Sequence, residues 1–214
     1  MKRPLLQIAL DLLDAKRALE IADMVAPLVE ILEVGTPLLK AVGVNIVTTL
    51  KERYPEKLIL ADTKTMDVGA VEAELVFKAG ADIMTVCAAA PLETIKAAID
   101  KTRTMGKQLV VDFIGIEDKV QRATAIAPLS PDYFSLHTAI DVQRTQSKSF
   151  QELGVFKEKF STPLCVAGGI SPEDIPVLIP YAPAIIVVGG FVTKAADPQR
   201  AVMTLKEEID HALS

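Results

Sequence analysis

Residues 58–79, LILADTKTMDVGAVEAELVFKA, hold the pattern that decides the fold. The apolar run Leu58–Ala61 predicts a short strand buried on both faces, and apolar residues three or four apart over Ala70–Ala79 predict a helix. Charged residues fill the segment between them, beginning with Asp62 directly after the run. The stretch is typical of one βα unit with polar side chains at the carboxyl end of its strand.

The same alternation continues in both directions along the chain. Eight apolar runs predict strands, at Leu5–Leu10, Ile31–Val34, Leu58–Ala61, Ile83–Val86, Leu109–Val111, Tyr133–Leu136, Leu164–Ala167 and Ile185–Val188. Helical periodicity predicts helices between them, such as Ala15–Ala26, Leu38–Glu52, Ala70–Ala79, Leu92–Met105 and Gln199–Leu213. Eight units favour a closed α/β fold, the (β/α)8 TIM barrel, over an open doubly wound sheet, because the closed barrel leaves no strand edge.

Composition limits the classes of partner. The 214 residues have no linker or low-complexity tract, so we expect one domain over 1–214. A net charge of −5 without a basic stripe argues against nucleic acid or an anionic membrane as partner. With no leader pattern or membrane-length apolar run, we expect a soluble, cytoplasmic protein. Cys87 and Cys165 lie in apolar runs and are expected to be buried thiols rather than zinc ligands.

Ionisable residues follow five of the predicted strands. They are Asp11, Glu33, Asp62 with Lys64, Asp112 and His137. Active sites of (β/α)8 enzymes lie at the carboxyl ends of the strands, so these side chains are expected to converge on one rim. For a single residue such as Asp11, capping of the next helix is an equally good explanation. The whole set favours a catalytic site, because carboxylates grouped in a barrel mouth are costly unless they are paired or bind a cation.

Each member of the set suits a chemical role. Lys64, flanked by carboxylates, is expected to stay protonated and stabilise a developing oxyanion; a surface ion pair or a Schiff-base amine are the alternatives. Glu33 and Asp62, from neighbouring strands, are expected to share a magnesium ion, although hydrogen bonds alone would also explain them. His137 suits proton transfer near neutral pH, although a lone histidine is often structural.

Two glycine pairs follow the seventh and eighth predicted strands. Gly168-Gly169 and Gly189-Gly190 stand where barrels of this class bind phosphate. Glycines let backbone N–H groups approach an anion, and a following helix N-terminus would add its dipole. One such pair is an ordinary turn signal. Two pairs in these two units together predict a phosphate site.

These motifs resemble the orotidine-monophosphate-decarboxylase-like barrels over nearly the whole chain. The resemblance is carried by Gln7–Asp11, Glu33–Pro37, the Asp62-x-Lys64-x-x-Asp67-x-Gly69 motif, Ala79–Asp82, Ala167–Ile170 and Val188–Gly190. It implies a homodimer with active sites at the subunit interface, where Asp67 reaches the partner's site beside Lys64. It also implies Mg²⁺ on Glu33 and Asp62 and a reaction through a metal-stabilised enediolate.

The resemblance leaves two reactions open in this branch of the family. One joins formaldehyde to D-ribulose 5-phosphate to give D-arabino-3-hexulose 6-phosphate, and the other decarboxylates 3-keto-L-gulonate 6-phosphate. The aldol reaction is favoured, since the decarboxylases carry Glu at the position of Asp112 and Arg at those of Ile140 and Phe191. Ala139 departs from the glycine usual in the aldol enzymes. A catalytically inert sugar-phosphate-binding barrel is a third possibility.

For the aldol reaction, the sequence predicts a division of roles in the site. His137 removes a proton from C1, and Lys64 with the metal stabilises the enediolate. Asp11, Asp67 and Asp112 position the reacting groups.

Overall fold

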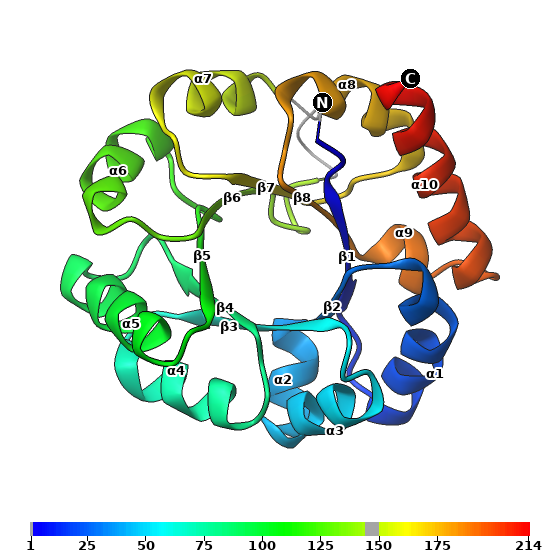
Figure 1. Cartoon of the computed structure of the whole chain (residues 1–214), viewed down its shortest axis with the longest axis horizontal. Helices are drawn as coiled ribbons and strands as arrows, with labels where there is room; N and C mark the ends of the chain where they lie inside the picture. Colours follow the sequence, from blue (N-terminus) through cyan, green and yellow to red (C-terminus); the bar gives the residue numbers. More distant parts are fainter. Residues whose placement is uncertain (1, 144–149) are drawn as a thin grey trace.

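The computed structural model describes residues 2–143 and 150–214. Its eight parallel strands pair in chain order and close on themselves, β8 with β1, which confirms the predicted (β/α)8 barrel (Figure 1). The strands are β1 (Leu5–Leu10), β2 (Ile31–Val34), β3 (Leu58–Thr65), β4 (Ile83–Cys87), β5 (Gln108–Asp112), β6 (Tyr133–His137), β7 (Leu164–Ala167) and β8 (Ile185–Val188). The predicted strands are thus found in all eight places, but β3 extends four residues further and contains Asp62 and Lys64.

Helices surround the barrel as a ring (Figure 1). They are α1 (Ala15–Val25), α2 (Thr36–Val42), α3 (Asn45–Arg53), α4 (Gly69–Lys78), α5 (Leu92–Thr104), α6 (Lys119–Ile126), α7 (Gln151–Lys159), α8 (Ile175–Leu178), α9 (Gly190–Thr193) and α10 (Pro198–Leu213), with short 3₁₀ turns η1 (Ala26–Leu28), η2 (Ala127–Leu129), η3 (Pro172–Asp174) and η4 (Ile179–Tyr181). The single helix predicted over Leu38–Glu52 is wrong. Gly43, at φ 78°, ends α2, and α3 starts two residues later.

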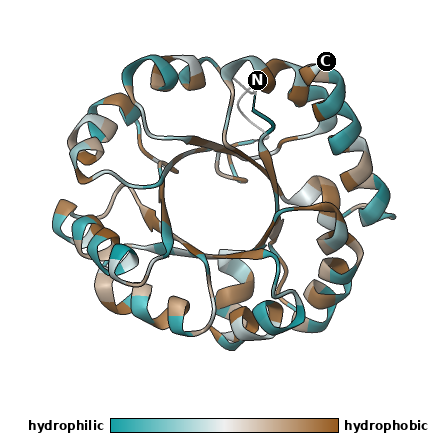
Figure 2. Ribbon diagram, viewed as in Figure 1, coloured by the Kyte–Doolittle hydropathy of each residue, from teal (hydrophilic) through white to brown (hydrophobic). Residues whose placement is uncertain are grey.

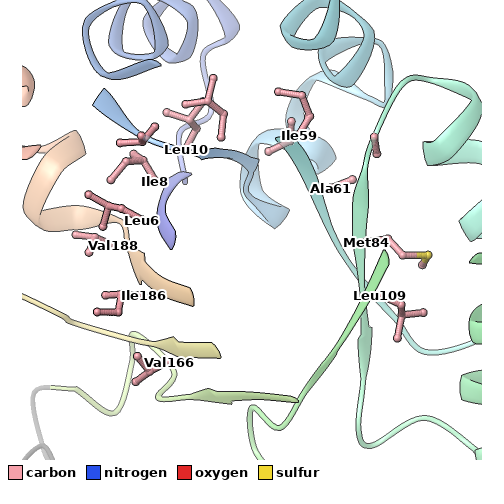
Figure 3. Close-up of a cluster of buried hydrophobic side chains, with 14 of the residues drawn as sticks. Leu6, Ile8, Leu10, Ile59, Ala61, Met84, Leu109, Val166, Ile186 and Val188 are labelled. Carbon is pink, nitrogen blue, oxygen red and sulfur yellow. The ribbon is translucent and has the colours of Figure 1, made fainter. Parts of the chain in front are cut away.

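The core has two layers because side chains alternate across each strand. Leu6, Ile8 and Leu10 of β1 pack outside the barrel against the helices, with their counterparts from other strands (Figure 3). Inside the barrel a second layer joins six strands: Ile31, Leu60, Ile83, Val110, Cys165 and Ile185. Figure 2 shows the strands coloured as hydrophobic and the outer sides of the helices largely as hydrophilic. The inward positions beyond the inner layer remain for polar side chains, Gln7 and Glu33 among them.

A carboxylate stands directly before three of the strands at the amino-terminal end of the barrel. Each accepts a hydrogen bond from the second residue of the preceding strand: Leu6 N to Glu30 at 2.9 Å, Ile59 N to Asp82 at 3.0 Å and Leu109 N to Asp132 at 2.9 Å. Asp82 also pairs with Lys51 and Lys107, both at 2.8 Å. Burial raises its pKa, but these partners outweigh that effect and hold the pKa below its usual value.

Two chain-level predictions can be compared with the structure. Cys87 and Cys165 are buried and form no disulfide, as predicted. Burial and Asp112 raise the pKa of Cys87 to about 11, and burial raises that of Cys165 well above its usual value, so both thiols stay protonated near neutral pH. Within 2–143 and 150–214 the helices are all too short or too polar to span a lipid bilayer.

Candidate active site

A cavity of about 930 Å³ opens at the carboxyl ends of the strands. The structure brings nearly all the predicted site residues to its wall: Asp11, Glu33, Asp62, Lys64, Asp112, His137, Gly168, Gly169, Gly189 and Gly190. They come from seven strands and the loops that follow them. Asp67 is the one predicted site residue that this cavity does not include.

Asp112, at the end of β5, links His137 to Lys64. Its Oδ2 lies 2.9 Å from Nδ1 of His137 and 3.1 Å from Nζ of Lys64, and its Oδ1 accepts the backbone N–H of Ile114 at 2.9 Å. Burial raises the pKa of Asp112, but His137 and Lys64 outweigh this and leave the pKa below its usual value. An ionised carboxylate only accepts hydrogen bonds, so Nδ1 of His137 carries the proton and Nε2 is free to accept one.

Lys64 reaches Asp62 through an irregular segment of β3. The pairing of β3 with β4 shifts register between Ala61 and Thr65, and Lys64 has φ 45°. The segment is therefore not regularly extended, yet Nζ of Lys64 lies 2.7 Å from Oδ2 of Asp62. Thr85 stabilises this turn, because its Oγ1 accepts the Lys64 N–H at 2.9 Å and donates to Oδ1 of Asp62 at 2.7 Å.

The charge state of Lys64 follows from these neighbours. Burial lowers its pKa, but Asp62 and Asp112 more than compensate, and the net pKa lies above the usual value. The amine is therefore protonated and is not a nucleophile. This supports the role of hydrogen-bond donor and argues against a Schiff base on Lys64.

Three carboxylates lie together on the other side of Lys64. Glu33 is buried, and burial with the charges of Asp62 and Asp11 raises its pKa well above the usual value. Desolvation and Asp62 likewise raise the pKa of Asp11. Gln7 donates to Oε2 of Glu33 at 2.6 Å, whereas Oε1 of Glu33 and both oxygens of Asp11 accept no hydrogen bond from the described residues.

This donor set fits a hard divalent cation. Oxygen ligands with high negative charge density suit Mg²⁺, which typically takes one or two carboxylates and fills its other positions with water and substrate. No three acidic, histidine or cysteine side chains in the described ranges converge into a complete metal cage. These residues could therefore bind a cation through two carboxylates, those of Glu33 and Asp62, with Asp11 nearby.

Asp11 does not cap the first helix. Asp14 does so, accepting the Arg17 N–H at 2.7 Å. Instead Oδ1 of Asp11 points at Gly35, only 2.1 Å from where a Cβ on that residue would lie. Gly35 must therefore be glycine while Asp11 keeps this position.

The glycine pairs allow close approach of neighbouring chain segments. Gly168 and Gly169 both have positive φ, at 106° and 66°, and a Cβ on Gly168 would lie 2.3 Å from the carbonyl oxygen of Thr138. The segments that follow the pairs, η3 and α9, are three and four residues long. η3 continues directly into α8 and η4, so helical turns run from Pro172 to Tyr181 after the first pair, whereas the second pair is followed by the short α9 alone.

Asp67 lies outside the cavity on the surface, just before α4. Its side chain is exposed, and its Oδ1 accepts the N–H of Val68 at 2.7 Å. Val68 has φ 47°, a strained conformation for a β-branched residue. A contribution of Asp67 to a partner's site stays a prediction.

The structure adds residues that the sequence did not identify. Gln7, Thr36 and Thr85 hold the carboxylates, and Lys194 lines the cavity beyond the second glycine pair. The signal for Lys194 was its spacing, four residues after Gly190, which places it one helical turn further along.

The fold and its similarity to known proteins identify the family of this chain. A closed eight-stranded barrel whose mouth holds paired acids, a lysine and a histidine defines a (β/α)8-barrel enzyme. The model of the Orotidine 5'-phosphate decarboxylase / HUMPS family matches residues 4–205, and the chain belongs to that family.

Individual relatives fall in two groups. 3-Hexulose-6-phosphate synthase of Mycobacterium gastri is 40% identical over 204 residues, 95% of this chain and 99% of that protein. The crystal structure of 3-hexulose-6-phosphate synthase from Salmonella typhimurium is 35% identical, covers 97% of this chain and 99% of its own, and has a TM-score of 0.93. That of 3-keto-L-gulonate-6-phosphate decarboxylase from Vibrio cholerae is 30% identical, with coverage of 98% and 99% and a TM-score of 0.88.

Proposed function

We propose that the protein is a lyase of the 3-hexulose-6-phosphate synthase type, which condenses formaldehyde with D-ribulose 5-phosphate to D-arabino-3-hexulose 6-phosphate. The observation that carries this proposal is the chain of contacts Asp62–Lys64–Asp112–His137, which places a proton acceptor and a fixed cation in one cavity. Similarity to the synthases at up to 40% identity over nearly the full chain supports it.

His137 acts as the base in this proposal. Asp112 holds the Nδ1–H at 2.9 Å, so the imidazole presents Nε2 to the substrate. Nε2 takes the proton from C1 of ribulose 5-phosphate, and the carbon–hydrogen electron pair forms the enediolate. C1 then attacks formaldehyde, and protonated His137 returns the proton to the new alkoxide oxygen.

Lys64 stabilises the charge that develops on oxygen. Its protonated Nζ is held by Asp62 and Asp112 at 2.7 and 3.1 Å, so it needs little reorganisation when the oxyanion forms. Glu33 and Asp62 are the residues that would hold Mg²⁺, which would supply Lewis-acid stabilisation of developing negative charge. Asp11 and Asp112 position these groups.

The walls of the cavity favour the aldol reaction over decarboxylation. Ile140 and Phe191 occupy the positions where the sequence comparison expects arginines in the decarboxylases, and both line the cavity with exposed apolar side chains. Among the described residues the cavity therefore lacks the arginines that would assist loss of carbon dioxide. The complete set of polar strand ends also speaks against an inert binding barrel.

A homodimer fits the surface around Asp67. Exposed apolar side chains lie close to it in the sequence, namely Met66 and Val68 between β3 and α4 and Val71 and Leu75 on α4, and exposed apolar groups favour a protein interface. We propose that a second copy of the chain covers this face and receives Asp67. The single domain over 1–214 and the cytoplasmic location stay predictions from the sequence.

The test is formaldehyde-dependent consumption of ribulose 5-phosphate by the purified protein, with Mg²⁺ and with excess chelator. Consumption that needs both formaldehyde and Mg²⁺ is the expected result. No consumption with formaldehyde, together with release of carbon dioxide from 3-keto-L-gulonate 6-phosphate, would overturn the proposal in favour of the decarboxylase.

A further inference from the structure

Lys194 is a cavity residue to which the reaction proposed above gives no role. We infer that its ammonium group binds the phosphate of the substrate, beside Gly189 and Gly190. The inference rests on the proposed function, because a sugar phosphate is the ligand it requires.

The position of Lys194 is set by the short helix α9. Lys194 directly follows α9, and its backbone N–H donates to the carbonyl of Gly190 at 3.2 Å. This turn folds the side chain back, so that Nζ lies 3.8 Å from where a Cβ on Gly190 would be. The ammonium group therefore stands beside the backbone of the second glycine pair and within the cavity wall.

Carboxylates outnumber lysines in the described lining of the cavity, and one of these lysines is unpaired. Within the described part of the chain, five carboxylates line it, those of Asp11, Glu33, Asp62, Asp112 and Asp141, against two lysines. Lys64 is occupied by Asp62 and Asp112. Among the described lining residues, Lys194 is the lysine that forms no ion pair and no side-chain hydrogen bond, so its charge is available to an incoming anion.

The other sources of positive charge near the second glycine pair are weak. α9, which follows this pair, is four residues long and supplies little helix dipole. The described lining residues include no arginine, and Phe191, next to Gly190, is apolar. Among the described residues, a phosphate dianion here would meet backbone N–H groups and the ammonium group of Lys194, which matches phosphate binding by a lysine as a point charge.

Calorimetric titration with inorganic phosphate and with D-ribulose 5-phosphate tests this assignment. We expect Lys194→Met to weaken both affinities about tenfold, the effect of losing one charge-assisted hydrogen bond at a partly exposed site. Lys194→Arg should remain within about threefold of wild type, because it keeps the charge. The matched control is Lys159→Met, which removes an exposed lysine at the end of α7 and should change neither affinity.

Salt dependence separates a direct contact from a structural effect. The wild-type affinity for phosphate should fall with rising ionic strength more steeply than that of Lys194→Met, because the variant has lost one screened charge pair. Equal phosphate affinity and equal salt dependence in the two proteins would overturn the inference. If wild type binds phosphate but fails to consume ribulose 5-phosphate with formaldehyde, the proposed function fails, and the phosphate titrations still decide the role of Lys194.

Discussion

Carboxylates at the two ends of the barrel are in opposite states. At the amino-terminal end, Asp82 forms ion pairs with two lysines and accepts a hydrogen bond from a backbone N–H, and its pKa lies below the usual value. At the carboxyl end, Glu33 is buried beside Asp62 and Asp11, and its pKa lies well above the usual value. The Asp82 carboxylate is therefore ionised and fully paired, whereas the Glu33 carboxylate lies close to other carboxylates without a cation of its own among the described residues.

The difference separates stability from function in one fold. Hydrogen bonds from the strand before them hold Glu30, Asp82 and Asp132 in place, so these residues tie neighbouring strands together. The carboxylates of the mouth destabilise the empty protein by mutual repulsion, and that repulsion is relieved by a cation. Substitutions at the amino-terminal end should therefore lower stability and leave activity unchanged. Substitutions of the carboxylates in the mouth should raise stability and lower activity.

The largest expected effect is loss of activity in His137→Asn. Removing the base should lower turnover about 10³-fold, within the usual range for general-base catalysis, while the Asn amide can still donate to Asp112. The measurement is solvent-deuterium exchange at C1 of ribulose 5-phosphate, which should stop. Phosphate affinity serves as the control and should stay unchanged. Exchange at the wild-type rate would remove His137 from the role of base.

At the opposite end, Asp82→Asn should cost about 2 kcal/mol of stability, because one amide N–H₂ must then face a lysine and both ion pairs are lost. Urea unfolding measures this. Activity per folded molecule should not change, since Asp82 lies away from the cavity. A stable variant with reduced activity would contradict the separation of the two ends.

Glu33→Gln should change stability in the opposite direction to Asp82→Asn. In the presence of chelator, removing this buried charge should stabilise the protein by about 1 kcal/mol, since Gln7 can still donate to the new amide oxygen. The same variant should lose the stimulation of activity by Mg²⁺. Thermal unfolding in chelator measures the first effect, and turnover with and without Mg²⁺ measures the second. Destabilisation in chelator would show that Glu33 is well satisfied without a metal.

The smallest expected effect is the pH dependence of the two stability changes, those of Asp82→Asn and Glu33→Gln relative to the wild type. Asp82 has a depressed pKa, so its stabilising contribution is complete above the unfolded value of about 3.9 and is lost as the pH falls through the lower folded value. Glu33 has a raised pKa, so its penalty is present above the folded value and disappears as the pH falls toward about 4.3.

Both differences should therefore vanish on acidification, that of Glu33→Gln at the higher pH. Unfolding free energies measured in chelator, from neutral pH down to below the unfolded pKa of aspartate at about 3.9, test the order. If the difference for Asp82→Asn disappeared first, the assignment of the two pKa directions would be wrong.

The sequence predicted the strands well because parallel barrel strands are buried on both faces and stand out as apolar runs. Seven of the eight predicted strands match the observed ones to within a residue at each end, and the ionisable residues after them converge as expected. The break between α2 and α3 was missed because the apolar period continues across Gly43, and a single glycine is tolerated within a helix.

The local shape of β3 could not be predicted from the sequence. Lys64 and Val68 adopt positive φ, which residues with a Cβ rarely do, and nothing in their identity signals it. The surrounding contacts impose it, for example the hydrogen bond from Lys64 N–H to Thr85. Lys194 was missed for a related reason, since its place in the cavity depends on how the turn of α9 folds back.

The contact between Asp11 and Gly35 restricts the routes by which this sequence can change. Any side chain at Gly35 would meet Oδ1 of Asp11, and even alanine would bring its Cβ to 2.1 Å from that atom. A substitution at Gly35 is therefore tolerated only after Asp11 has shortened or turned away, and the reverse order passes through a damaged site. These two positions, each directly after one of two successive strands, form an epistatic pair in which the order of mutation decides whether an evolutionary path is open.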